Sequence, residues 1–384
     1  MRADLDASSE AESSHRYAVV VAGGAGTRLW PLSRESLPKQ MQSLLGERSL
    51  IYETVERIRG VVPTRNIYVS TTQNYAGQIS LHLPQIPSEN IIVEPVARGT
   101  AAAFALFTYT LYERDPDALI FTLASDHKVA ETDRFRQTLR TSFDFVERNS
   151  DHIGLVGITP TRPDTGLGYI KARTYVVQAH PSVYAVEKFV EKPSQSVASA
   201  YVDSGDYFWS AGYYCYKART LLDAYTKADI GLVTATQRYA ESHDIDDYLM
   251  APQKLHEIEL IDSTEFPLAL IPADFKWSDI GNWQALLLAQ REASGEPRGS
   301  EHPSLHIDVG SVNSYVRAEG SRVVATVGVS DITVHSNDEV ATVWIGDTLV
   351  VAMADAILVI DGAHHAKLPQ VLEVLRAQEM INYL

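Results

Sequence analysis

Cysteine is nearly absent from this sequence: Cys215 is the only one among 384 residues. One thiol excludes a disulfide framework and a zinc site built from cysteines, and it favours a reducing compartment. Long apolar runs are lacking as well, since the longest, LVVAMADAILVI, contains Asp355 and is too short to span a bilayer. The amino-terminal stretch MRADLDASSEAESSHR has no apolar core of the kind that signal peptides carry. We therefore expect a soluble, cytoplasmic protein.

Basic residues are in deficit: 33 lysines and arginines stand against 49 aspartates and glutamates, which gives a net charge of −16. This charge excludes a general nucleic-acid binder and a membrane-surface binder, because both need a basic face. A local cluster of cations in so acidic a chain is instead typical of a site for a small anion. We expect no nucleic-acid partner and no membrane partner.

Strands and helices alternate along the first part of the chain, after an acidic stretch of residues 1–15 that we expect to be a disordered tail. YAVVVA (17–22) is predicted to be a buried strand, SLIYETVERIRG (49–60) a helix, and GTAAAFALFTYTLYER (99–114) a largely buried helix. The strand ALIFTLAS runs directly into Asp126. This order predicts an α/β fold, a Rossmann-like sheet with helices on both faces, whose ligands bind beyond the carboxyl ends of the strands.

Longer alternating strands take over from about residue 168 to 216, which predicts a mixed-sheet extension. Helices are expected from 218 to 260, and a further strand and helix flank the motif SDIGNW. We assign residues 16–292 to one large domain. ASGEPRGSEHPS (293–304) is typical of a linker, and residues 305–384 are predicted to form a second domain.

The second domain contains an internal repeat: VATVGVSDITVH from Val324 resembles VATVWIGDTLVV from Val340. Repeated short strands with no helix between them favour coils of a small parallel β-helix, followed by a helix near 366–382. A hairpin of similar strands is the alternative interpretation. Stacked coils leave apolar faces that proteins usually cover, so we expect this domain to support a homodimer.

The stretch VVVAGGAGTRLWPLSRESLPKQ (19–40) places three glycines and three basic side chains, Arg28, Arg34 and Lys39, directly after the first strand. Glycine amides can bind phosphates closely, and the cations neutralise phosphate charge. A dinucleotide fingerprint would need a glycine where Leu29 stands, and a Walker loop would need a Gly-Lys pair. Both motifs fail, so the loop predicts a phosphate site of another type.

Six motifs occur in the order expected of the sugar-1-phosphate nucleotidyltransferases: AGGAGTRLWPLSRESLPKQ, EPVARGTAAA, LASDH, TGLGYI, FVEKP and WSDIGNW. The chain resembles this family over about residues 17–290, and most of all its mannose-1-phosphate guanylyltransferases. The resemblance implies that residues 16–292 are a catalytic domain. There a sugar 1-phosphate oxygen would attack the α-phosphate of a nucleoside triphosphate, with GTP expected, and pyrophosphate would leave. Such a reaction depends on positioning and electrostatic stabilisation, and its anionic nucleophile needs no general base.

The resemblance also assigns roles to the phosphate-facing residues. Arg28 and Lys39 would hold the triphosphate, and Lys192 would face the phosphates. Asp126 and Asp279 match the family's two metal ligands and would hold Mg²⁺, with Mn²⁺ as a possible substitute. A helix cap for Asp126 and a turn for Asp279 are the alternative interpretations, and His127 is interpreted as structural. The remaining nucleotide-binding positions are Ala22, Gly23, Gly24, Gly26, Thr27, Arg98, Thr100 and Ser125.

Base and sugar recognition are assigned in the same way. Glu94 is the predicted reader of the base, because a carboxylate can accept both the ring N–H and the exocyclic amine of guanine; an exposed glutamate at a strand end is the alternative. By resemblance Glu191 accepts sugar hydroxyls, whereas a simple ion pair with Lys192 is the alternative. The other predicted sugar positions are Gly168, Ser210, Ala211 and Gly212.

Three positions depart from the family pattern. WSAG at 209–212 replaces the usual W-N-S-G, RGTAAA replaces R-N-T-A-P-A, and Leu167 replaces the second aromatic of T-G-Y-G-Y. Shorter and less polar side chains predict a wider sugar site, which leaves mannose, glucose, a heptose or a cyclitol phosphate open. A catalytically silent nucleotide-sugar sensor or regulatory subunit is the main rival hypothesis. An oxidoreductase and a β-helix acyltransferase are weaker rivals.

Overall fold

The computed structural model divides the chain into two compact units. Residues up to 23 together with 51–277 form the first unit, and residues 24–50 together with 278–384 form the second. The residues that the structure describes are 15–24, 26–177, 183–257, 267–294, 306–309, 315–318, 324–327, 332–336, 340–345, 348–353, 355–361 and 367–384. The predicted tail of residues 1–15 lies outside them apart from His15, as does most of the predicted linker of residues 293–304.

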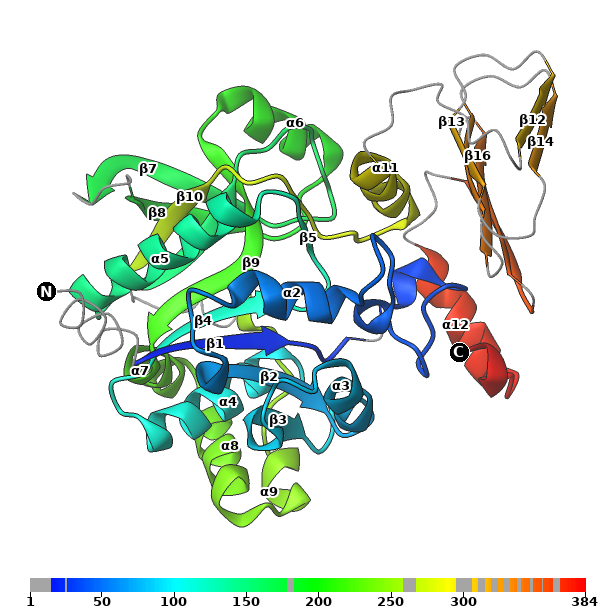
Figure 1. The fold of residues 1–384 in the computed structure, drawn as a ribbon. Helices are drawn as coiled ribbons and strands as arrows, with labels where there is room; N and C mark the ends of the chain where they lie inside the picture. The colour runs from blue at the N-terminus through cyan, green and yellow to red at the C-terminus, as the bar shows by residue number, and fades with distance from the viewer. Residues whose placement is uncertain are drawn as a thin grey trace, which may run out of the picture. The chain divides into compact units, whose positions relative to one another are not determined.

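A nine-stranded mixed sheet forms the centre of the first unit, in the order β3-β2-β1-β4-β9-β6-β10-β8-β7 (Figure 1). Its strands are β1 (Arg16–Val21), β2 (Ile67–Thr72), β3 (Ile91–Glu94), β4 (Leu119–Ala124), β6 (Ile153–Ile158), β7 (Tyr169–Val177), β8 (Val183–Val190), β9 (Tyr207–Lys217) and β10 (Leu268–Ala273). The first four are mutually parallel, whereas β9 is antiparallel to both β4 and β6. This sheet confirms the predicted α/β fold with a mixed extension.

Helices cover both faces of this sheet (Figure 1). They are α2 (Leu50–Ile58), α3 (Ala76–His82), α4 (Thr100–Arg114), α5 (Thr132–Arg148), α6 (Gln195–Ser204), α7 (Ala218–Ala228), α8 (Ile230–Ser242) and α9 (Ile245–Leu249). Local residues determine where two of these helices begin. α4 begins after Gly99, which has φ 86°. The Asp229 carboxylate caps the start of α8 by accepting hydrogen bonds from the N–H groups of Gly231 and Leu232. None of the described helices is long and apolar enough to cross a membrane.

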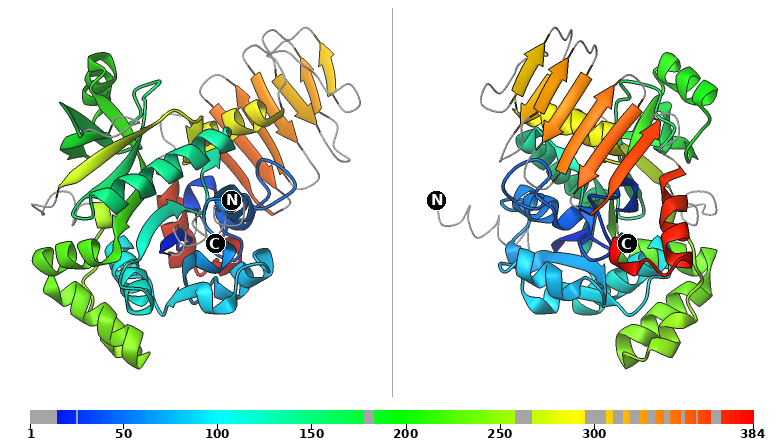
Figure 2. Two further views of the ribbon diagram at one scale, coloured as in Figure 1. Left: turned by 60° about the vertical axis from the view of Figure 1, so that its left-hand side comes forward. Right: turned by 90° about the vertical axis from the view of Figure 1, so that its right-hand side faces the viewer.

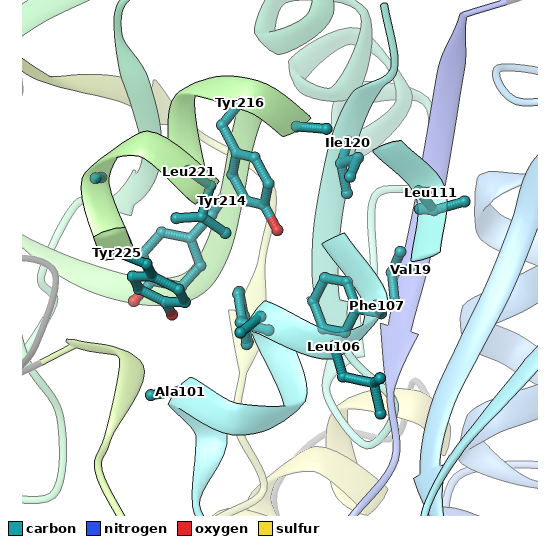
Figure 3. Close-up of a cluster of buried hydrophobic side chains, with 14 of the residues drawn as sticks. Val19, Ala101, Leu106, Phe107, Leu111, Ile120, Tyr214, Tyr216, Leu221 and Tyr225 are labelled. Atoms are coloured by element: carbon teal, nitrogen blue, oxygen red, sulfur yellow. The ribbon is translucent and has the colours of Figure 1, made fainter. Parts of the chain in front are cut away.

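The core of the first unit lies on the α4 and α7 side of the sheet (Figure 3). Labelled side chains come from strands β1, β4 and β9 and from helices α4 and α7: Val19, Ile120, Tyr214, Tyr216, Ala101, Leu106, Phe107, Leu111, Leu221 and Tyr225. On the other face, Phe121 of β4 meets Phe143 of α5 with ring centroids 6.2 Å apart. Both faces of the central strands are therefore buried, as the long apolar runs of these strands predict.

The second unit contains the glycine-rich loop and the carboxyl-terminal third of the chain. Its helical elements are η1 (Thr27–Leu29), η2 (Lys39–Met41), α11 (Trp283–Ser294), α12 (Leu368–Ala377) and η6 (Ile381–Tyr383). Leu29 and Trp30 share one buried cluster with Trp283 and with Leu368 and Leu372 of α12. The loop therefore groups with residues beyond 278, whereas the domain boundaries predicted from the sequence placed it with residues 16–292.

The carboxyl-terminal strands are β12 (His306–Val309), β13 (Tyr315–Ala318), β14 (Val324–Val327), β15 (Ile332–Ser336), β16 (Val340–Ile345), β17 (Thr348–Met353) and β18 (Ile357–Asp361). β12 is parallel to β14, and β13 is parallel to β15, whereas β15 to β18 are antiparallel neighbours (orange in Figure 2). The parallel β-helix is thus not confirmed, and the hairpin interpretation holds for the second copy of the repeat. Only Gly346 and Asp347 separate β16 from β17, and a two-residue link can join antiparallel strands but not parallel ones.

Candidate active site

The carboxyl ends of β1 and β4 lie side by side, because these strands are parallel neighbours with Val21 opposite Ala124. Ala22 and Ser125 therefore follow at the same edge, where β1 stands between β2 and β4 and the strand order reverses. Such a switch point is where open α/β sheets bind ligands. The Ser125 N–H donates to the Val21 carbonyl oxygen at 3.1 Å, and the Ala22 N–H donates to that of Ser70 at 2.8 Å. These hydrogen bonds fix the backbone immediately before Gly23 and Asp126.

His127 follows the predicted metal ligand Asp126 in the chain, and a hydrogen bond from Trp277 holds its ring in place. The Trp277 indole N–H donates to His127 Nδ1 at 3.2 Å. An indole nitrogen can only donate, so Nδ1 is the acceptor and the neutral ring carries its hydrogen on Nε2. His127 Nε2 is 3.9 Å from Asp126 Oδ1, and the Asp126 side chain is 29% exposed. The Trp277 indole therefore holds the His127 ring, whose Nε2 lies beyond hydrogen-bonding distance of this Asp126 oxygen.

The glycine-rich loop is closed by the segment that carries Lys39. Gly26 has φ 65°, and a Cβ at that position would lie only 2.6 Å from the Lys39 Cβ, so no other residue fits without displacing the lysine. Gln40 Nε2 donates to the Gly24 carbonyl oxygen at 2.9 Å. Lys39 itself is buried, and its Nζ donates to the main-chain oxygen of Asp279 at 2.6 Å. The second unit thus brings the loop, its lysine and the SDIGNW motif together.

Asp279 stands in a tight turn whose hydrogen bonds fix its carboxylate. Ser278 Oγ accepts from the Ile280 N–H at 3.2 Å, and Asp279 Oδ1 accepts from the Gly281 N–H at 3.0 Å. Ile280 has φ 46°, which is unfavourable for a β-branched residue, and such strain is concentrated at functional sites. A Cβ at Gly281 would lie 2.1 Å from Asp279 Oδ2 and 3.1 Å from Arg28 Nη1. The carboxylate of Asp279 and the guanidinium of Arg28 therefore converge on Gly281.

The predicted sugar residues also meet, in the first unit. The Ser210 N–H donates to the Gly168 carbonyl oxygen at 2.8 Å. A Cβ at Gly168 would stand 2.8 Å from Glu191 Oε2, so glycine keeps this carboxylate in place. Lys192 Nζ pairs with Glu191 Oε1 at 2.7 Å, which is the ion pair that the sequence left as an alternative. Ala211, at 1% exposure, is instead buried.

Two further predicted positions adjoin this group. Lys192 has a left-handed backbone, with φ 45°, and Gly212 has φ 66°. The Gly212 N–H donates to Ser210 Oγ at 3.3 Å. Both conformations are uncommon for ordinary residues and turn the chain sharply next to Glu191 and Ser210.

Glu94, the predicted reader of the base, is buried at the end of β3. The Tyr248 hydroxyl donates to Glu94 Oε2 at 2.6 Å. Burial raises the pKa of Glu94 to about 7, although the Tyr248 hydrogen bond lowers it. The carboxyl is therefore poised between its two protonation states near neutral pH. Sequence reasoning missed Tyr248, because no local signal connects residues 94 and 248.

Arg98 has structural partners that the sequence did not reveal. Its Nε and Nη2 donate to the Ala251 carbonyl oxygen at 2.9 and 2.6 Å, and Nη2 also donates to that of Leu249 at 3.0 Å. Thr100 Oγ1 accepts from the His256 N–H at 2.8 Å. These two residues hold the chain that follows α9, and their predicted contacts with a nucleotide stay a prediction.

Metal binding was predicted for Asp126 and Asp279, which belong to different units. No three His, Cys, Asp or Glu side chains in the described part of the chain are placed to hold a metal ion. The two aspartates offer hard carboxylate oxygens, and Mg²⁺ is usually held by one or two carboxylates together with substrate phosphates. Each aspartate therefore has the chemistry of a magnesium ligand, and their joint binding of the ion stays a prediction. Cys215 is buried, and burial raises the pKa of its thiol, which excludes it as a nucleophile.

The first unit has a mixed α/β sheet with predicted site residues at its strand ends. In the second unit a glycine loop lies with an arginine, a lysine and an aspartate, a combination typical of enzymes that handle phosphates. The nucleotidyl transferase family model matches residues 17–295. The chain belongs to this nucleotidyl transferase family.

Curated relatives extend over nearly the whole chain. Mannose-1-phosphate guanylyltransferase ManC of Salmonella typhimurium strain LT2 is 32% identical over 94% of this chain and 73% of its own length. A mannose-1-phosphate guanylyltransferase of Escherichia coli strain K12 is also 32% identical, over 95% of this chain and 74% of its own. A solved structure described as mannose-1-phosphate geranyltransferase from Thermus thermophilus has a TM-score of 0.76 at 25% identity, covering 94% of this chain and 99% of that one.

Proposed function

We propose that the protein transfers GMP from GTP to a sugar 1-phosphate, with mannose 1-phosphate as the first candidate, and releases pyrophosphate. Two of the curated relatives are mannose-1-phosphate guanylyltransferases, which supports guanine as the base and mannose as the sugar. The observation that carries the proposal is the convergence of Arg28, Lys39 and Asp279 beside the glycine loop. Two cations and one carboxylate around a glycine loop are suited to a polyphosphate and its metal ion.

The chemistry requires little of the protein beyond positioning. A phosphate oxygen of the sugar 1-phosphate forms a bond to the α-phosphorus of GTP, while the bond from that phosphorus to the oxygen bridging to the β-phosphate breaks. Pyrophosphate leaves with that oxygen. The nucleophile is already an anion, so no side chain has to remove a proton. Arg28 and Lys39 bind the triphosphate and stabilise the charge that grows on the leaving group.

Asp126 and Asp279 would hold the divalent metal ion, with Mg²⁺ expected and Mn²⁺ as a substitute. When bound there, the ion would neutralise phosphate charge and make the phosphorus more electrophilic. The Asp279 carboxylate is oriented for this by the hydrogen bond that it accepts from the Gly281 N–H. Losing either carboxylate is expected to reduce turnover at least about a hundredfold, the scale of losing a major transition-state stabiliser.

Glu94 would select guanine, because its ionised carboxylate can accept from two N–H groups of that base at once. Thymine and uracil offer no such pair of donors. Tyr248 already donates to Glu94 Oε2 and so fixes the plane of the carboxylate. This arrangement supports a preference for GTP over UTP and dTTP.

A pyrophosphate-release screen tests the proposal. GTP, ATP, UTP and dTTP are each combined with mannose, glucose and heptose 1-phosphates and a cyclitol phosphate, with and without Mg²⁺. We expect release only when GTP, a sugar 1-phosphate and the metal ion are all present. Binding of GTP and sugar phosphate by calorimetry without any pyrophosphate would instead identify a silent regulatory homologue.

The proposal includes a cytoplasmic homodimer. Ile357 and Val359 on β18, the last strand of its sheet, are 68% and 65% exposed, and an apolar edge of this kind is usually covered in a stable protein. Light scattering of the parent and of an Ile357→Lys, Val359→Lys variant tests this part. We expect a dimer that the double substitution dissociates; a parent that is already monomeric at working concentration contradicts it.

A further inference from the structure

The loop of residues 159–168 joins β6 to β7 and ends next to the predicted sugar residues. At the start of β7, Tyr169 is opposite Val190 of β8 on one side and Trp209 of β9 on the other. Both pairings are antiparallel, so the residue before Tyr169 is level with the residues that follow Val190 and Trp209. One row across β8, β7 and β9 therefore contains the predicted sugar residues Glu191, Gly168 and Ser210.

Asp164 makes two hydrogen bonds that shape the end of this loop. Its Oδ1 accepts from the Gly166 N–H at 2.9 Å, and its own N–H donates to the Tyr169 hydroxyl at 2.9 Å. Tyr169 is fully buried, so the second bond ties the loop to the core. Because Gly166 and Tyr169 stand on either side of Gly168 in the chain, the two bonds fix the main chain around that glycine.

Arg162 connects the same carboxylate to β9. Its Nη2 donates to Asp164 Oδ2 at 2.8 Å, and its guanidinium carbon lies 5.1 Å from the centre of the Trp209 ring. A guanidinium over the face of an indole is a favourable contact. Trp209 is buried and directly precedes Ser210. Asp164 is therefore held against the strand that carries a predicted sugar residue.

The main chain at Gly168 lies close to the Glu191 carboxylate. A Cβ at Gly168 would stand 2.6 Å from Phe189 Cζ and 2.8 Å from Glu191 Oε2. A shift of the loop would therefore change the space between this main chain and Glu191. The side chains of Arg162 and Asp164 are 51% and 25% exposed, so their ion pair contributes little to overall stability. Its effect is expected in the geometry of the loop.

We propose that Asp164 is a positioning residue for sugar recognition, which holds the main chain of Gly168 in place beside Glu191 and is itself supported by Arg162. This inference rests on the proposed function. A site with fixed acceptors discriminates between epimeric sugars, because a misplaced hydroxyl leaves a buried acceptor unpaired. Loosening the loop should therefore weaken sugar binding and reduce this discrimination, with no effect on GTP.

Calorimetric titration with mannose 1-phosphate and its 2-epimer glucose 1-phosphate tests the inference, in the presence of a GTP analogue that cannot release pyrophosphate. We expect Asp164→Ala to raise the Kd of mannose 1-phosphate about tenfold or more, because the Gly166 bond and the ion pair are both lost. The ratio of the two sugar Kd values should move towards one. Binding of GTP alone should stay unchanged.

Two further variants separate the contributions of the turn and of the ion pair. Asp164→Asn keeps an oxygen for the Gly166 N–H and loses only the ion pair, so the Kd of mannose 1-phosphate should rise less than about fivefold. Arg162→Ala removes the ion pair from its other side and should resemble the asparagine variant.

Asp115→Ala is the matched control. Asp115 Oδ1 accepts from the N–H two residues further on, that of Asp117, at 3.0 Å, and its Oδ2 pairs with His15 and accepts from the Tyr17 hydroxyl. This carboxylate thus makes the same kinds of contact as Asp164. It precedes β4 and lies at the amino ends of the parallel strands, away from the predicted site residues. Its loss should lower stability and leave both sugar Kd values unchanged.

Four results would overturn the inference: unchanged sugar Kd values in Asp164→Ala, an equal rise of these values in Asp115→Ala, an equal loss of GTP affinity in Asp164→Ala, or a parent that binds neither sugar 1-phosphate. Failure of the proposed function is a different result. In that case the parent binds a sugar 1-phosphate in the calorimeter and releases no pyrophosphate from GTP.

Discussion

The Lys39 ammonium donates a hydrogen bond of 2.6 Å to the main-chain carbonyl oxygen of Asp279, 240 residues further along the chain. The lysine predicted to hold the triphosphate is therefore anchored on the residue predicted to hold the metal ion. Lys39 is nearly fully buried, so this bond also offsets part of the cost of removing an ammonium from water. A hydrogen bond within the second unit therefore joins the first and the last motif of the family signature.

Gly281→Ala should impair the metal site without unfolding the protein. The new Cβ would stand 2.1 Å from Asp279 Oδ2, and the aspartate side chain can yield by rotating away. We expect turnover to fall about tenfold or more and the Mg²⁺ concentration for half-maximal activity to rise. Steady-state kinetics against Mg²⁺ measure both effects. Gly77→Ala, where an added Cβ meets nothing within 4 Å, is the control; equal behaviour of the two variants would remove Asp279 from the metal site.

Arg28→Ala should reduce the chemical step rather than sugar binding. The Arg28 guanidinium and the Asp279 carboxylate converge on Gly281, where we expect phosphate charge to develop. We expect kcat to fall about a hundredfold, with little change in the KM for the sugar 1-phosphate. Arg59→Ala serves as control, since Arg59 is an exposed partner of Glu56 within one helical turn. A variant that changed only the sugar KM would place Arg28 at the sugar instead.

Glu94→Gln should alter how stability depends on pH. Burial raises the pKa of Glu94 from 4.5 to about 7 in the folded protein, so between these values the folded state holds a proton that the unfolded state has lost. The free energy of unfolding must therefore fall as pH rises through this window, by on the order of 3 kcal/mol for this group. The glutamine variant lacks this decrease.

Urea unfolding of both proteins between about pH 5 and 8 measures the difference. A stability gap between parent and variant that is constant across this range would show that Glu94 titrates normally. In the same window we expect GTP affinity of the parent to rise with pH, because only the ionised carboxylate accepts from both guanine donors.

Arg34→Met should destabilise the second unit. The Arg34 guanidinium donates to the carbonyl oxygens of Pro31 at 2.6 Å and Tyr383 at 2.9 Å, and it pairs with Asp355 at 3.0 Å. Removing it leaves carbonyl groups short of a donor, which costs about 1–3 kcal/mol. Chemical denaturation checks this value. Arg219→Met removes an exposed ion pair with Asp223 and should change stability by less than about 1 kcal/mol; equal losses would contradict the anchoring role of Arg34.

Much of the first unit could be predicted from hydrophobic patterning alone. The strand at 17–22 and the helix at 99–114 have strong local signals, and the structure has them as β1 and α4 with ends shifted by at most one residue. The position of Ser125 and Asp126 at a strand end also followed from this pattern, because parallel strands bring their carboxyl ends to one edge of the sheet. Their role in the site stays a prediction.

Long-range contacts were beyond prediction from one sequence. Arg98 donates to carbonyl groups about 150 residues away, and nothing local distinguishes it from a phosphate-binding arginine. In the carboxyl-terminal strands the sequence repeat favoured stacked parallel coils. The two-residue Gly-Asp link between β16 and β17 instead indicates the antiparallel pairing that these strands have.

Phosphorus NMR of a mixture of the protein, GTP, mannose 1-phosphate and Mg²⁺ tests the central claim most directly, because it identifies every phosphorus species formed. We expect the signals of GTP and of the phosphate monoester to decline together, while a diphosphate diester and free pyrophosphate grow in equal amounts. The Asp279→Ala protein should show none of this on the same time scale. Formation of GDP and inorganic phosphate, or the absence of any diester with every sugar 1-phosphate supplied, would contradict nucleotidyl transfer to a sugar phosphate.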